Sequence, residues 1–123
     1  MMPWNMALPI FVADDDADTL EALQFMLTCE GYRVATFASG SELLAACPAA
    51  LPGLVVVDYV MPDLTGLEVH RQLAELGVTA PAILITGHPD WSIRQCAQAA
   101  GVPLVEKPAA QDLLRAIEEA ARS

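Results

Sequence analysis

Short apolar runs alternate along this chain with longer segments that carry apolar residues at helical spacing. Each run is bounded by turn residues, a pattern typical of strands that are buried on both faces of a parallel sheet. The pattern predicts strands at about 10–13, 33–37, 54–57, 82–85 and 104–106.

Capping signals open the segments that follow these strands. Asp16 or Asp18 can cap the first helix, and Asp18-x-x-Glu21 has the spacing of a capping box. Ser39-x-x-Glu42 is a second box that opens a short helix through position 46. The remaining helices are expected to begin at Gly66, after Asp90 and at about Ala110.

Glycines mark where three of the helices stop. Gly31 supplies a left-handed end for the first helix, and Gly77 and Gly101 end the third and fourth. Alternating strands and helices predict a parallel sheet with helices on both faces. We expect one domain over residues 1–123, with its core at about 9–121 and no effector domain after the fifth helix. One face of the first helix is expected to carry Leu20, Leu23 and Leu27, and the inward face of the last helix Leu113, Leu114 and Ile117. The apolar residues of the third helix are Leu67, Leu73 and Leu76.

Composition narrows the class of protein. A length of 123 residues fits one domain, and the net charge of −10 argues against direct binding to nucleic acid. The hydrophobic content of 54% is high, and buried strands explain part of it. An exposed apolar face for a partner is the other explanation. Residues 1–9 lack a basic residue and are broken by Pro3 and Pro9, so they are neither a signal peptide nor a membrane span.

The three cysteines show no spacing that indicates a disulfide or a metal site. Cys29, Cys47 and Cys96 all fall in predicted helices. We interpret them as small buried hydrophobic residues in a protein of the reducing cytoplasm.

Reactive or charged side chains stand where the apolar runs end. The carboxyl ends of parallel strands meet at one edge of a sheet, where ligands bind in such folds. Three or four carboxylates, a hydroxyl and an ammonium at that edge suit a hard divalent cation and a phosphoryl group. These residues are Asp14, Asp15 and Asp16 after the first run, Asp58 after the third, Thr86 after the fourth and Lys107 after the fifth.

The same residues give the chain a resemblance to a known family. The acidic cluster 14–16, the stretch 58–66 (DYVMPDLTG), the pair Thr86-Gly87 and the triplet 106–108 (EKP) occur in order. Together they resemble the receiver domain of two-component response regulators, over about residues 9–121. The resemblance implies the doubly wound, flavodoxin-like (CheY-like) fold with five parallel strands in the order 2-1-3-4-5.

The resemblance also implies a magnesium site. Asp15 and Asp58 would bind Mg²⁺ directly, together with the backbone carbonyl of Val60, and Asp14 would bind through water. Mg²⁺ prefers oxygen ligands in octahedral geometry and keeps several waters, which this set of ligands allows. An acidic turn that merely caps a helix is the competing interpretation, but it leaves Asp58 unexplained.

Asp58 is, by the same resemblance, the phosphoacceptor. A carboxylate can attack phosphorus to give an aspartyl-phosphate. Lys107 would add a fixed cation and Thr86 a hydroxyl that donates to a phosphoryl oxygen. The Lys107–Pro108 bond is expected to be cis, so that the lysine points inward.

The implied function is that of a cytoplasmic phosphoacceptor that a sensor histidine kinase phosphorylates and that contacts no membrane. It would catalyse only its own phosphorylation and dephosphorylation. The chain departs from the family at Leu104 and Ala109, where an aromatic residue is usual. Phosphorylation-dependent output could therefore be weakened, and a receiver-like interaction module is the alternative. Self-association through the fourth helix, fifth strand and fifth helix would fit the high hydrophobic content.

Two other classes fit less well. A flavodoxin-type carrier needs a loop rich in glycine and hydroxyl groups after the first strand to hold a phosphate. The acidic cluster 14–16 would repel that phosphate instead. An aspartyl-phosphate phosphatase resembles an Asp-x-Asp motif, whereas Asp58 is followed by Tyr59 and Val60.

Overall fold

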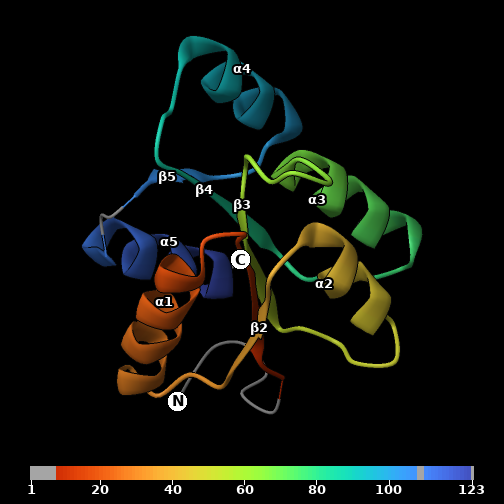
Figure 1. Cartoon of the computed structure of the whole chain (residues 1–123), viewed down its shortest axis with the longest axis vertical. Helices are drawn as coiled ribbons and strands as arrows, with labels where there is room; N and C mark the ends of the chain where they lie inside the picture. The colour runs from red at the N-terminus through yellow and green to blue at the C-terminus, as the bar shows by residue number, and fades with distance from the viewer. Residues whose placement is uncertain (1–7, 108–109, 123) are drawn as a thin grey trace.

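A computed structural model describes residues 8–107 and 110–122 (Figure 1). The predicted cis bond between Lys107 and Pro108, the departure at Ala109 and most of the segment 1–9 therefore lie outside the described residues. The described chain has a cis bond between Cys47 and Pro48.

Five parallel strands form one sheet in the order β2-β1-β3-β4-β5, which confirms the predicted order. The register is continuous across the centre, where Val12 pairs with Val56 and Val56 with Ile83. Every residue of β1, β3 and β4 is buried, because helices cover both faces of the sheet. The strands are β1 (Ile10–Ala13), β2 (Val34–Phe37), β3 (Leu54–Asp58), β4 (Ala82–Thr86) and β5 (Leu104–Glu106).

The helices divide between the two faces (Figure 1). Alternate strand residues point to opposite faces, so Phe11 joins one apolar core and Ile10 the other. The first core also holds Leu43 of α2 and Leu73 of α3, and the second holds residues of α1 and α5. Helix α4 buries only Ala97 among its described residues. The helices are α1 (Ala17–Cys29), α2 (Gly40–Ala46), α3 (Gly66–Glu75), α4 (Trp91–Ala100) and α5 (Ala110–Arg122).

The helix boundaries agree with the sequence at most positions. Asp90 caps α4, and Ser39 accepts a hydrogen bond from the backbone N–H of Glu42 at the start of α2. Gly31, Gly77 and Gly101 all have positive φ, as a helix stop with a left-handed residue requires.

Two details of the capping prediction need correction. The box Asp18-x-x-Glu21 is wrong, because Asp16 is the cap of α1 and accepts a hydrogen bond from the N–H of Asp18. A full capping box occurs instead at α3, between Thr65 and Glu68, where the sequence analysis placed none.

Burial corrects the prediction for two cysteines, and one apolar residue at the end of α3 is exposed. Leu76 is 44% exposed, because α3 has ended and Val78 takes the inward position while its N–H donates to the carbonyl of Leu73. Cys29 and Cys96 are exposed, since the neighbouring Leu27 and Ala97 face the core.

The third cysteine, Cys47, is buried as expected. It caps the end of α2 instead of lying within the helix. No helix in the described part of the chain is both long and apolar enough to cross a membrane.

Candidate functional site

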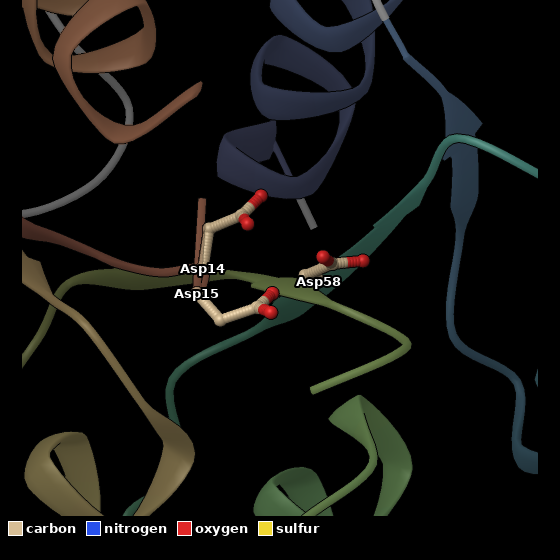
Figure 2. A group of neighbouring side chains, drawn as sticks. All are labelled: Asp14, Asp15 and Asp58. Carbon is tan, nitrogen blue, oxygen red and sulfur yellow. The ribbon is translucent and has the colours of Figure 1, made fainter. Parts of the chain in front are cut away.

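Three carboxylates meet at the carboxyl edge of the sheet (Figure 2). Asp14 and Asp15 follow β1, and Asp58 is the last residue of β3, the neighbouring strand. One carboxylate oxygen from each residue lies within 4.8 Å of the others. Asp14 and Asp58 are buried, whereas Asp15 is exposed. The cluster is therefore anchored in the protein and open to water on one side.

Lys107 brings a positive charge to the same edge. Its Nζ lies 2.7 Å from Oδ2 of Asp14 and 3.0 Å from Oδ2 of Asp58. The backbone N–H of Lys107 donates to the carbonyl of Thr86 at 2.8 Å, which extends the pairing of β4 with β5 by one residue. The structure thus brings together the two carboxylates and the ammonium, as the positions at strand ends predicted.

The electrostatic environment perturbs two of these groups. Burial raises the pKa of Asp58 to about 6; the hydrogen bond from Lys107 lowers it and the charge of Asp14 raises it further. Burial lowers the pKa of Lys107, but its hydrogen bonds and ion pairs with Asp14 and Asp58 outweigh this, so the pKa is raised. Lys107 therefore stays charged at neutral pH, while an ionised Asp58 favours additional positive charge nearby.

Asp14 has a buried oxygen whose nearest partner is the ammonium of Lys107. Oδ1 of Asp14 accepts a hydrogen bond from the N–H of Asp16 at 2.9 Å. Oδ2 lies 2.7 Å from Nζ of Lys107, and no other described group donates to Oδ2. A carboxylate oxygen has two acceptor sites, so Oδ2 can accept a further hydrogen bond from a water molecule on a bound cation. The donor set, all hard oxygens, fits Mg²⁺.

Val60 lies in the loop that follows Asp58. Its N–H is 3.3 Å from Oδ1 of Asp58, and its side chain is exposed. The loop thus turns back over the carboxylate that it follows. The part of its carbonyl in binding metal stays a prediction.

Thr86 is buried at the end of β4. Its hydroxyl accepts a hydrogen bond from the N–H of His88 at 3.2 Å, so it stabilises its own loop in this structure. Gly87 lies beside it, where an added Cβ would meet no described atom within 4 Å. The backbone beside Thr86 therefore has open space around it.

Gly66 supports the site in a way that the sequence analysis did not foresee. Its N–H donates to the carbonyl of Tyr59 at 2.9 Å. A Cβ at this position would lie 2.6 Å from Cδ2 of Leu84 and 2.9 Å from the carbonyl oxygen of Asp58. The start of α3 therefore packs directly on the backbone of Asp58. The glycine was visible as a helix start, but its contact with β3 was not.

An apolar groove of 410 Å³ opens beside Lys107, between α1 and α5. Leu23 and Met26 line it from α1, and Val105 and Leu113 line it from β5 and α5. It offers an apolar surface close to the carboxylate cluster.

Comparisons with known proteins agree with this geometry. A family model described as the response regulator receiver domain matches residues 10–118. The transcriptional regulatory protein FixJ of Rhizobium meliloti (strain 1021) is 37% identical over 113 residues, covering 90% of this chain and 55% of that protein. The response regulator protein TmoT of Ectopseudomonas mendocina is 39% identical over 113 residues, covering 90% and 51%. This chain thus spans about half the length of these two relatives.

Solved structures agree as well. A crystal structure described as FixJ-N has a TM-score of 0.84 and 35% identity, with 93% of each chain covered. A CheY-like receiver domain protein from Methanospirillum hungatei JF-1 has a TM-score of 0.81 and 29% identity, with 91% of each chain covered.

Proposed function

This chain belongs to the response regulator receiver domain family, and on that premise we propose that Asp58 accepts a phosphoryl group from a sensor histidine kinase in a Mg²⁺-dependent reaction. The observation that carries the proposal is the position of Asp58. It is a buried carboxylate whose Oδ2 lies 3.0 Å from Nζ of Lys107, beside two further carboxylates. An ion pair with a purely structural role would not need the negative charge of two further carboxylates beside it.

The phosphoryl transfer is a displacement at phosphorus. An oxygen of Asp58 attacks the phosphorus atom, and the bond between phosphorus and the donor's histidine nitrogen breaks. The electron pair of that bond leaves with the imidazole. Lys107 stabilises the negative charge on the transferring group, because its ammonium is fixed by Asp14 and by its own place after β5.

The metal ligands we propose are Asp15, Asp58 and the carbonyl of Val60, with Asp14 acting through water. The closeness of the three carboxylates supports this set, as does Oδ2 of Asp14, to which no described group other than Lys107 donates. Bound Mg²⁺ would neutralise charge on the transferring group. Asp15, which is exposed, leaves room for the waters that the ion retains.

Thr86 is the proposed switch residue. Its hydroxyl now accepts from the N–H of His88 and can turn to donate to a phosphoryl oxygen on Asp58. The loop 86–90 would follow the hydroxyl and so alter the start of α4, which buries few residues.

Partner binding completes the proposal. The groove beside Lys107 offers the kinase an apolar surface within reach of Asp58. Homodimer formation through α4, β5 and α5 stays a prediction, as does the cytoplasmic location. Leu104, half-buried in place of the usual aromatic residue, packs on the core shared with α2 and α3. The alternative of an interaction module independent of phosphate is not favoured, because the family match is accompanied by a complete set of site residues.

Intact-protein mass spectrometry tests the acceptor. After incubation with acetyl phosphate and Mg²⁺, the wild-type chain should gain the mass of one phosphoryl group. Asp58→Asn should gain none, whereas Asp112→Asn, a change at an exposed residue of α5, should behave like wild type. If Asp58→Asn gains the same mass, Asp58 is not the acceptor.

A further inference from the structure

The loop between β3 and α3, residues 59–65, contains Val60, whose backbone carbonyl is one of the metal ligands proposed above. The two ends of this loop are firmly held. The N–H of Tyr59 donates to the carbonyl of Ile85 at 2.8 Å, and its carbonyl accepts from the N–H of Gly66 at 2.9 Å. At the other end, Thr65 takes part in the capping box of α3.

The middle of the loop is tied to a different element, the first turn of α2. Oδ2 of Asp63 accepts hydrogen bonds from both the backbone N–H of Ser41, at 2.8 Å, and its hydroxyl, at 2.6 Å. The hydrogen bond from the Ser41 side chain is the main reason why the pKa of Asp63 is lowered, so the carboxylate is ionised at neutral pH. Hydrogen bonds to a charged acceptor are stronger than those between neutral groups.

Close packing accompanies these hydrogen bonds. A Cβ on Gly40 would lie 2.6 Å from Cγ2 of Val69, and 3.4 Å from both Cβ of Leu64 and Cε of Met61. The start of α2 therefore rests directly on the loop and on α3. Any movement of the loop away from α2 would break both the packing and the hydrogen bonds of Asp63.

Val60 cannot hold its own position through its side chain. The residue is 59% exposed, and its backbone N–H lies 3.3 Å from Oδ1 of Asp58, a long hydrogen bond. Residue 60 therefore depends on its neighbours along the loop. Before residue 60, Tyr59 is held by its bonds to Ile85 and Gly66. After residue 60, the hydrogen bonds from Ser41 to Asp63 hold the loop against another element.

We propose that Ser41 and Asp63 are positioning residues for the site: their hydrogen bonds fix the loop so that the carbonyl of Val60 is held ready for a divalent cation. This inference rests on the proposed function for the identity of the metal ligand. Groups that orient a metal ligand commonly affect metal affinity by about tenfold or more, although they do not touch the ion.

A simpler interpretation is that Ser41 and Asp63 only stabilise α2. Backbone N–H groups in the first turn of a helix lack partners within the helix, and Asp63 satisfies one of them. Ser39 provides a matched control, because it satisfies the N–H of Glu42 in the same turn without contacting the loop through that bond. If stabilising α2 were the whole role, loss of either serine hydroxyl would have the same consequences.

Mg²⁺ titration by calorimetry distinguishes the two interpretations, with thermal melts run on each variant to check folding. Asp63→Ala and Ser41→Ala should each raise the dissociation constant for Mg²⁺ by about tenfold, and the double variant should be no worse than Asp63→Ala. Ser41→Thr keeps the hydroxyl and should restore the affinity. Ser39→Ala should lower the melting temperature without changing the affinity.

Amide hydrogen exchange of residues 60–64 without Mg²⁺ gives a readout independent of metal. It should become faster in Ser41→Ala and stay unchanged in Ser39→Ala. Wild-type affinity and exchange in Ser41→Ala, alongside a wild-type chain that binds Mg²⁺, would overturn this inference alone. A wild-type chain that binds no Mg²⁺ would overturn the proposed metal site and this inference with it.

Discussion

The ammonium of Lys107 lies closer to Asp14 than to Asp58, at 2.7 Å from Oδ2 of the first and 3.0 Å from Oδ2 of the second. The side chain of Asp14 is fully buried. Lys107 therefore serves two carboxylates at once, and neither has a cation to itself. Additional positive charge near Asp14 would weaken its attraction for Lys107. The ammonium could then interact with a phosphoryl group at Asp58.

Loss of Lys107 should destabilise the metal-free protein. Lys107→Met leaves the buried Asp14 and Asp58 without a cation, which should reduce the free energy of unfolding by about 3 kcal/mol. Arg115→Met is the matched control, because Arg115 is exposed and 3.9 Å from Asp112, so its loss should cost less than about 1 kcal/mol. Urea unfolding of both variants measures the difference; equal losses would contradict a structural role for Lys107.

Mg²⁺ should stabilise the wild-type chain. An ion that binds only the folded state adds about 2.7 kcal/mol to the free energy of unfolding at a concentration one hundred times its dissociation constant. Asp15→Ala removes one of the clustered carboxylates and should largely abolish the rise in melting temperature. Asp112→Ala, on the exposed side of α5, should keep it. An equal rise in Asp15→Ala and wild type would rule out Asp15 as a ligand.

The stability of the metal-free protein should depend on Asp58 and on pH. The pKa of Asp58 is about 6 in the folded state, above its ordinary value of 3.8, so the folded state binds the proton more tightly. This group therefore reduces stability at pH above its folded pKa, and the reduction disappears as the pH falls through the window from about 6 to 3.8. Asp58→Asn, which mimics the neutral acid, should be more stable than wild type at about pH 7, and its advantage should shrink by about pH 4.

Urea midpoints of wild type and Asp58→Asn across that pH range measure this difference, and other titrating groups cancel in the comparison. In Mg²⁺ the order should reverse, because the ion stabilises the ionised carboxylate. A constant difference between the two proteins at all pH values would show that Asp58 is not perturbed.

Gly66→Ala should destabilise the protein and disturb the backbone of Asp58, on which the start of α3 packs. The new Cβ would lie 2.6 Å from Cδ2 of Leu84 and 2.9 Å from the carbonyl oxygen of Asp58, and the second atom cannot move without shifting β3. Overpacking of this kind costs about 1–3 kcal/mol. Gly87→Ala adds a Cβ in open space and should leave the urea midpoint unchanged. Normal stability together with normal phosphorylation of Gly66→Ala would disprove this close contact.

Output should depend little on the fifth strand. Leu104 replaces an aromatic side chain and stays half-buried, so it offers no ring that can change position when Thr86 moves. A ligand shifts an equilibrium only by its differential affinity for the two states. Sedimentation should therefore show only a modest increase in self-association with beryllofluoride. A monomer that dimerises tightly only with beryllofluoride would show that the replacement at Leu104 does not weaken the switch.

The sequence by itself determined the topology and the composition of the site. Buried apolar runs identify parallel strands, and parallel strands place their carboxyl ends together, so Asp14, Asp58, Thr86 and Lys107 had to share one edge. The glycines at the helix ends were equally predictable, since a left-handed residue strongly favours glycine.

Tertiary structure decided how those residues divide their roles. Asp14 and Asp15 are adjacent in sequence, yet one is buried against Lys107 and the other is exposed, because successive residues at a strand end point in opposite directions. Cys96 and Ala97 differ in exposure for a related reason, because α4 packs on the core with Ala97 facing inward and Cys96 facing outward. The contact of Ser41 with Asp63 joins the first turn of α2 to a loop residue 22 positions further along the chain. The sequence around either residue does not indicate that the two side chains meet. Only the packing of α2 against α3 brings them together.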